Sequence, residues 1–299
     1  MTNDDVSENA GPEVHVQTAE GLLDVLSARK EPWHNDKSIQ WLFRGQPSTT
    51  MSLLPRAWRD DYLRKLRHHA TDPSGLVFFE GQFLCEFLEV CHRQGLRVPG
   101  EPGSLNAIRT GTEYLHRFVS SPSTWPPNEL LPALALAQHH GVPTRLLDWS
   151  YRPYVAAYFA AVGALSMPAS PSRIAVWCLN TVALRALFAD PHPVEILPVA
   201  SDGNSNLAAQ RGAFTLFRAY EHRNGVAQPV ALDTVILEKA RSSGSQVLRC
   251  YSLPYTEARK LLQLLRAEGV DGAALFPGFQ GAAEYALDRL GFRWSPVED

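Results

Sequence analysis

Two segments that are far apart in the chain carry residue types able to hold an anion or move a proton. The first is an apolar run that ends at Arg44, directly before Gly45. A guanidinium at the rim of a sheet, beside exposed backbone, suits a pyrophosphate or a ribose, because arginine binds such groups as a two-pronged donor. A structural salt bridge made by Arg44 is an equally good alternative.

The second segment runs over residues 138–150, where a helix is expected to end at Gly141 before a turn made rigid by Pro143. Thr144, Arg145 and Asp148 are expected to line a polar cleft. The alternative is an internal ion pair between Arg145 and Asp148 that only holds the loop. The segment also contains Gln138, His139, His140, Trp149 and Ser150. The two histidines are candidate acid–base groups, although a histidine at a helix end is more often a cap or a packing residue.

Two further segments give weaker signals. Gln210 and Arg211 stand beside Gly212, just before a predicted strand, and offer an amide and a guanidinium near a flexible residue. Residues 275–281 form a turn into the last predicted helix and are expected to be structural. No glycine-rich phosphate loop, nucleophile elbow or zinc-protease motif occurs.

The composition is that of a folded globular protein and excludes a mainly disordered chain, a coiled coil or a collagen-like fibre. The chain has 299 residues, of which 45% are hydrophobic and 20% charged. The formal net charge of −3 gives no overall basic field for nucleic acid, although a local basic groove remains compatible with it. Of the 28 cationic side chains, 23 are arginine and only 5 are lysine.

The sequence predicts a cytoplasmic protein with no membrane partner and no metal. Its N-terminus is polar and acidic, without the basic and apolar regions of a signal peptide. The longest apolar run, residues 155–167, is too short to span a bilayer. Neither the four cysteines nor the ten histidines show the paired spacing of a zinc site.

Hydrophobic periodicity predicts an α+β fold, with most helices in the first half and most strands in the second. Helices are expected over residues 18–30, 61–69, 76–94, 107–119, 129–139, 153–165 and 256–269, with a short one after 276–278. Strands are expected over residues 39–44, 174–179, 215–218, 234–237 and 246–251, and residues 98–106 are expected to be loop.

These residues resemble a known family, the FRG domain. The resemblance is carried by Phe43-Arg44-Gly45 and by the motif over residues 138–150, which an alanine-rich helix follows. Gln210 with Gly212 and Phe214, and then Leu275-Phe276-Pro277, match later family positions. The resemblance implies an FRG domain over residues 37–292. Residues 1–12 are then a disordered tail, 13–36 a helical lead-in and 293–299 a C-terminal tail.

The chain is also similar, more weakly, to ADP-ribosyltransferases of the Arg–Ser–Glu type. This similarity implies a split antiparallel sheet with a large N-terminal or inserted helical portion, and a cleft that takes NAD as substrate. Arg44 would bind the pyrophosphate or the adenine-side ribose, and Ser150 or Thr144 would order the cleft. The full set implied to bind NAD is Arg44, Gly45, Thr144, Arg145, Ser150 and Gln138. The set implied to be catalytic is Asp148, Gln210 and His140.

The sequence departs from these enzymes at the third motif, where Gln210 stands in place of glutamate. The glutamate stabilises a cationic transition state by its charge, which an amide lacks. Three alternatives follow. The protein is a slow or inactive enzyme, or Asp148 supplies the missing negative charge from another position, or the third motif is not the segment that contains Gln210.

Three functions are therefore carried forward. The first is NAD-dependent ADP-ribosyl transfer to a protein or nucleic acid, as a toxin or anti-phage defence effector with a neutralising partner protein. The second is a non-catalytic nucleotide or RNA sensor. The third is an interaction scaffold in which the motifs are only structural.

Overall fold

A computed structural model describes residues 6–8, 12–30, 32–33, 41–59, 62–63, 72–188, 194–198, 209–218, 220–223 and 226–291. The predicted C-terminal tail, residues 293–299, lies outside these ranges, as does the predicted helix over 61–69 apart from residues 62–63. The predicted disordered tail over residues 1–12 is corrected in part, because Val6–Glu8 forms a strand that pairs with its neighbour.

Within the described residues, eight strands form one mixed sheet in the order β1-β2-β10-β5-β3-β4-β7-β6, and β8 and β9 form a separate hairpin. The strands are β1 (Val6–Glu8), β2 (Glu13–Val16), β3 (Trp41–Gln46), β4 (Leu146–Ser150), β5 (Arg173–Asn180), β6 (Val194–Pro198), β7 (Gly212–Phe217), β8 (Tyr220–Arg223), β9 (Val226–Pro229) and β10 (Leu248–Pro254). The described pairs of the sheet are antiparallel except β2 with β10, which is parallel. The predicted α+β class is confirmed, whereas the sheet is mixed and not purely antiparallel.

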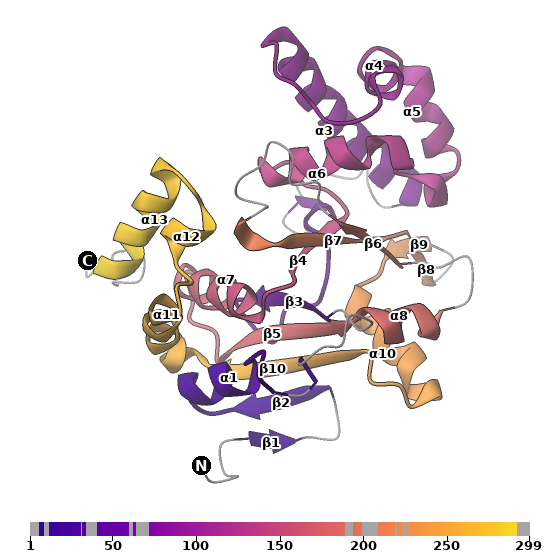
Figure 1. Cartoon of the computed structure of the whole chain (residues 1–299). Helices are drawn as coiled ribbons and strands as arrows, with labels where there is room; N and C mark the ends of the chain where they lie inside the picture. The colour runs from indigo at the N-terminus through magenta and orange to yellow at the C-terminus, as the bar shows by residue number, and fades with distance from the viewer. Residues whose placement is uncertain are drawn as a thin grey trace.

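The sheet is nearly divided between β3 and β4. These two strands share one residue pair, Phe43 with Ser150. By contrast, β3 pairs with β5 from Trp41 to Gln46, and β4 pairs with β7 along its whole length. The sheet therefore consists of two well-paired halves that meet at a single point, and Figure 1 shows α7 beside this junction.

Helices cover both faces of the sheet and form a separate portion at one end (Figure 1). The α-helices are α1 (Ala19–Val25), α3 (Pro73–Arg93), α4 (Pro102–Thr110), α5 (Thr112–Val119), α6 (Leu131–His139), α7 (Pro153–Leu165), α8 (Thr181–Leu187), α10 (Leu232–Ser243), α11 (Ala258–Ala267), α12 (Gly272–Leu275) and α13 (Phe279–Leu290). The short 3₁₀ helices are η2 (Arg56–Trp58), η4 (Pro122–Thr124), η5 (Asn128–Leu130) and η6 (Tyr255–Glu257).

Three apolar clusters follow this arrangement. Helices α1, α7 and α11 pack on one face of the sheet, and α8 and α10 pack on the other. The four helices α3 to α6 lie between β3 and β4 in the chain, and their cluster includes Leu146 of β4 and Phe214 of β7. This inserted helical portion is therefore attached to the half of the sheet that contains β4.

Helix α7 lies unusually close to β3, and Gly45 makes this possible. A Cβ atom at position 45 would lie 1.9 Å from the carbonyl oxygen of Ala156 and 2.6 Å from the nitrogen of Ala160. No side chain fits there. The helix begins with Pro153 in its first turn, where proline is favoured, and its alanines let the two backbones approach.

Most of the predicted elements that lie in the described residues are confirmed, and two are not. The helix over 153–165 is confirmed, and the strands predicted over 174–179 and 246–251 correspond to β5 and β10. The strand predicted over 234–237 is wrong, because these residues lie in α10, which buries Leu232 and Ile236 one turn apart. The predicted loop over 98–106 is corrected too, since Glu101 caps α4 from Pro102 onward.

Candidate functional site

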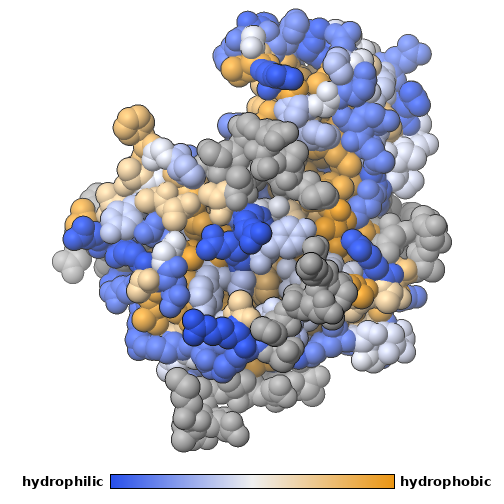
Figure 2. All heavy atoms as spheres, in the orientation of Figure 1, coloured by the Kyte–Doolittle hydropathy of each residue, from blue (hydrophilic) through white to orange (hydrophobic). Residues whose placement is uncertain are grey.

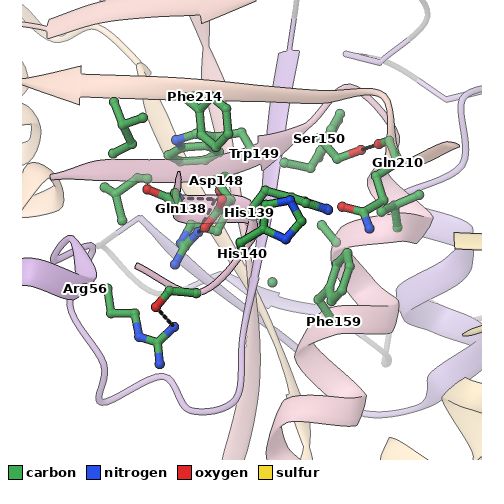
Figure 3. A pocket seen from close by; sticks show the side chains of 18 of the residues that line it. Arg56, Gln138, His139, His140, Asp148, Trp149, Ser150, Phe159, Gln210 and Phe214 are labelled. Carbon is green, nitrogen blue, oxygen red and sulfur yellow. Dashed lines mark hydrogen bonds and ion pairs between the residues drawn. The ribbon is translucent and has the colours of Figure 1, made fainter. Parts of the chain in front are cut away.

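A cleft of about 970 Å³ opens where the two halves of the sheet separate. Its walls come from β3, η2, the end of α6, β4, the start of α7, and residues 276–280. Figure 2 shows a group of strongly hydrophilic side chains near the centre of this face of the molecule. Figure 3 shows the side chains that line the cleft from close by.

Strand β4 presents Asp148 to the cleft. Along this strand Leu147 and Trp149 are buried in the apolar cluster beneath α8 and α10, and the intervening Asp148 points the opposite way, as strand alternation requires. The Asp148 side chain is 63% exposed. Its carboxylate is the only one among the described residues that line the cleft.

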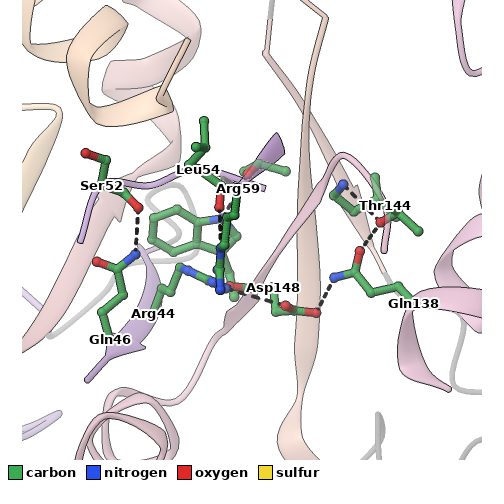
Figure 4. A network of polar contacts seen from close by, with 11 residues as sticks. Arg44, Gln46, Ser52, Leu54, Arg59, Gln138, Thr144 and Asp148 are labelled. Atoms are coloured by element: carbon green, nitrogen blue, oxygen red, sulfur yellow. Dashed lines mark hydrogen bonds and ion pairs between the residues drawn. The ribbon is translucent and has the colours of Figure 1, made fainter. Parts of the chain in front are cut away.

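Arg44 of β3 joins the two halves of the sheet at this point. Its Nη1 donates to the backbone oxygen of Asp148 at 2.7 Å and lies 3.5 Å from the carboxylate oxygen Oδ2 (Figure 4). Its Nε is buried and has no hydrogen-bond partner among the described residues. Burial lowers the pKa of Arg44, an effect that Asp148 opposes and nearby Arg59 reinforces. The sequence suggests that Arg44 ends its strand. Arg44 instead lies within β3, where the two halves of the sheet separate.

A chain of hydrogen bonds holds the Asp148 carboxylate from its other side. The side-chain amide of Gln138 donates to Oδ1 of Asp148 at 2.6 Å. The hydroxyl of Thr144 in turn donates to the carbonyl oxygen of Gln138, and it accepts the backbone N–H of Leu146 at 3.2 Å. Figure 4 shows the Thr144–Gln138–Asp148 part of this chain.

Two more arginines make the cleft positively charged. Arg56 of η2 donates to the carbonyl oxygen of Gly141 at 3.4 Å and lies over the Tyr62 ring, 5.1 Å from its centroid. Arg59, just after η2, donates through Nε to the carbonyl oxygen of Leu54 at 3.1 Å. Together with Arg44 they give the described lining of the cleft three guanidinium groups against the single carboxylate of Asp148. Such a wall attracts an anionic ligand.

His139 and His140 enter the cleft from the C-terminal end of α6. Their ring centroids are 5.1 Å apart and the ring planes are nearly perpendicular. His140 is exposed and its ring is stacked toward Phe87 of α3, with centroids 6.4 Å apart. Burial lowers the pKa of His139, and His140 lowers it further, while Asp148 acts in the opposite direction.

The opposite end of the cleft combines amides with aromatic rings. Ser150 donates to the backbone oxygen of Gln210 at 2.7 Å, so its hydroxyl fixes the segment before β7. The Gln210 amide donates to the carbonyl oxygen of Leu275 at 3.2 Å. Phe159 of α7 and Phe276 meet edge to face, with centroids 6.1 Å apart. An apolar wall edged by amides is suited to a planar base.

Seven of the nine predicted site residues line the cleft, and Thr144 and Arg145 do not. The prediction that Arg145 contacts a ligand is wrong, because its side chain is 0% exposed and its Nε pairs with Glu80 at 2.6 Å. The alternative, an ion pair between Arg145 and Asp148, is wrong as well, because Arg145 pairs with Glu80 instead. Thr144 is fully buried and acts only through Gln138. Gly45 lines the cleft, but position 45 must be glycine because α7 lies too close to leave room for a side chain.

Several lining residues were missed by sequence reasoning, namely Arg56, Arg59, Tyr62, Phe159 and Phe276, whereas His139 was already a candidate acid–base group. Arg56 and Arg59 follow the Arg44 segment closely, and a count of cations after that strand could have indicated them. Phe159 gave no signal distinct from an ordinary core residue, and Phe276 belongs to the turn over 275–281 that was expected to be structural.

The described part of the chain contains neither a long apolar helix nor a cluster of metal-binding side chains. No helix there combines the length and apolar character needed to cross a bilayer. No group of three or more histidine, cysteine, aspartate or glutamate side chains there is arranged to hold a metal ion.

Comparison with known proteins gives one match. A family model described as an FRG domain matches residues 39–167, which include β3, α6, β4 and α7. No curated protein and no solved structure matches the chain. The matched segment thus supplies Arg44, Gln138, His139 and Asp148, whereas Gln210 and Phe276 lie beyond it.

Proposed function

The chain contains an FRG domain, and for its cleft we propose NAD-dependent ADP-ribosyl transfer. In this proposal the cleft binds NAD, cleaves the bond between nicotinamide and ribose, and passes ADP-ribose to a macromolecular acceptor, protein or nucleic acid. An enzyme of this kind would serve as a toxin or an anti-phage defence effector and would require a neutralising partner protein.

The observation that carries the proposal is the position of Asp148. Its carboxylate is held between Arg44 and Gln138 in a cleft otherwise lined by guanidinium groups, amides and rings. A dinucleotide has the matching composition, because its pyrophosphate is anionic, its ribose groups carry hydroxyls and its bases stack. The guanidinium groups of Arg44, Arg56 and Arg59 are suited to the pyrophosphate.

The chemistry assigns a separate task to the carboxylate. When the C1′–N bond breaks, its electron pair leaves with nicotinamide, and positive charge develops on C1′ and the ring oxygen of the ribose. A fixed carboxylate stabilises this charge, because it is already oriented before the reaction begins. Gln210 adds an amide at the position where the similar transferases have glutamate, so Asp148 provides the negative charge that Gln210 lacks.

The proposal is tested by incubating the protein with NAD labelled in its adenosine part and measuring both free nicotinamide and label on cellular protein and nucleic acid. Asp148→Asn preserves the shape of the side chain and removes its charge. We expect it to lower nicotinamide release by about 10²–10³-fold. Arg44→Gln is expected to weaken NAD binding, measured by calorimetry. Folded protein that releases no nicotinamide and labels no fraction would contradict the proposal.

A binding module without turnover is the second candidate, and two observations favour it. The Asp148 charge is already partly neutralised by Arg44, and the Gln210 amide is engaged by Leu275. Under this alternative, calorimetry shows saturable nucleotide binding while nicotinamide remains attached.

A further inference from the structure

His139 is a polar group of the cleft that the proposed reaction has not yet used. It lines the cleft, its side chain is half-buried, and no hydrogen bond joins its ring nitrogens to another described residue. In the view of Figure 3 the two histidines lie between Asp148 on one side and Gln210 with Phe159 on the other. A half-buried imidazole with open nitrogens, next to the reacting region, is a candidate for proton transfer.

The surroundings of His139 keep its imidazole neutral. His140 stands beside it at the end of α6, and Arg44, Arg56 and Arg59 face the same cleft from β3 and the η2 segment. Among the described residues of the cleft lining, Asp148 is the one acidic group that faces it. Burial has the largest effect and lowers the pKa of His139 below its ordinary value. At neutral pH the ring is therefore able to accept a proton.

We propose that His139 is the general base that removes the proton from the incoming acceptor, and that this acceptor is a neutral hydroxyl. This inference rests on the proposed function and adds the identity of the base and the class of the acceptor.

The step balances as follows. The acceptor oxygen forms a bond to C1′ of the ribose while the C1′–N bond breaks, and nicotinamide leaves as a neutral molecule with the electron pair. The hydroxyl proton passes to an open ring nitrogen of His139, which later releases it to water. Asp148 stabilises the ribose cation between these two bonds.

A general base is needed only by an acceptor that carries a proton on its attacking atom. A carboxylate acceptor carries no proton on its attacking oxygen, so it would leave the base without a task. A guanidinium or ammonium acceptor would be repelled by Arg44, Arg56 and Arg59. A neutral hydroxyl, on a side chain or a sugar, meets neither objection and needs deprotonation to attack.

The experiment compares two small nucleophiles in the presence of NAD. Methanol must lose a proton when it attacks, whereas azide is already an anion. The O-methyl and azido derivatives of ADP-ribose are quantified for wild-type protein and for His139→Gln. We expect the variant to form the methyl product about 10²–10⁴-fold more slowly. We expect its rate with azide to equal that of the wild type, which also shows that the variant is folded and binds NAD.

Matched variants make the assignment decisive. His92→Gln, at an exposed position on α3, is expected to behave as the wild type with both nucleophiles. If His139→Gln retains methanol transfer, or if only His140→Gln loses it, the assignment to His139 is wrong while the proposed function stands. If wild-type protein forms neither product and releases no nicotinamide, the proposed function itself fails.

Discussion

At the scale of single residues, the direction of a few hydrogen bonds determines where the Asp148 carboxylate is held. The Asp148 carboxylate can only accept hydrogen bonds, so Gln138 must turn its NH₂ group toward Asp148. The Gln138 carbonyl oxygen then faces Thr144, whose hydroxyl donates to it while accepting the N–H of Leu146. Thr144 is thus a positioning residue, although it is sealed from the cleft.

Thr144→Val tests this role, because valine has nearly the same shape but no hydroxyl. The variant leaves the buried N–H of Leu146 without its acceptor, and we expect a loss of about 1–3 kcal/mol in unfolding free energy. The side-chain amide protons of Gln138 should also exchange faster with water, measured by ¹H–¹⁵N NMR.

Thr144→Ser keeps the hydroxyl and is the matched control, expected to restore the slow exchange of the Gln138 amide. Equal exchange rates in wild type, Thr144→Val and Thr144→Ser would show that Thr144 does not orient Gln138.

Sequence reasoning could identify the two conspicuous arginines but could not separate their roles. Arg44 and Arg145 both stand in polar motifs, and both were expected to contact NAD. Only Arg44 reaches the cleft, because Glu80, 65 positions earlier in the chain than Arg145, binds Arg145 in the interior. A contact between such distant positions leaves no local pattern, so residue types and spacing cannot reveal it.

At the scale of elements, the site depends on the close approach of α7 to β3. This contact places Phe159 and Ala156 on one wall of the cleft and Arg44 on the next. Helix α7 is predictable from sequence because its proline start and long apolar run agree. Strand β4 was not predicted as a strand, since it is short, and Asp148 interrupts its apolar residues.

Gly45→Ala is expected to disrupt this contact. The added methyl group would meet the backbone of α7 at 1.9 Å, and a helix backbone cannot move aside as a side chain can. Overpacking usually lowers the unfolding free energy by about 1–3 kcal/mol, and we expect Gly45→Ala to reach or exceed the upper end of that range. Chemical denaturation measures the effect.

The control is Gly163→Ala in the same helix, where the nearest atom is Cβ of Pro47 at 3.3 Å. Because alanine favours a helix, this change should alter the unfolding free energy by no more than about 1 kcal/mol. A similar loss in both variants would mean that the approach of α7 at Gly45 is not special.

At the scale of the whole molecule, a buried ion pair attaches the inserted helices to the sheet. Glu80 of α3 accepts the backbone N–H and the Nε of Arg145 at 2.6 Å, and also the indole N–H of Trp125 at 2.9 Å. The Arg145 guanidinium donates to the carbonyl oxygen of Trp125 and lies over Trp58. Arg145 directly precedes β4, so this network fixes the strand that carries Asp148.

Glu80→Ala is therefore expected to destabilise the protein by about 3–5 kcal/mol, because it leaves the Arg145 charge buried without its counter-ion. Glu86→Ala, at an exposed position on the same helix, should change the unfolding free energy by less than about 0.5 kcal/mol. Thermal or urea unfolding of the two variants decides the matter. A small effect of Glu80→Ala would mean that the helical portion is anchored elsewhere.

The single residue pair between β3 and β4 has a further consequence for how a ligand is held. Arg44 belongs to one half of the sheet, Asp148 to the other, and a molecule in the cleft touches both halves at once. Since one backbone pair is a weak mechanical constraint, we expect the angle between the two halves to change when a ligand binds. Substitutions buried deep in either half would then alter affinity by changing that angle, without any contact to the bound molecule.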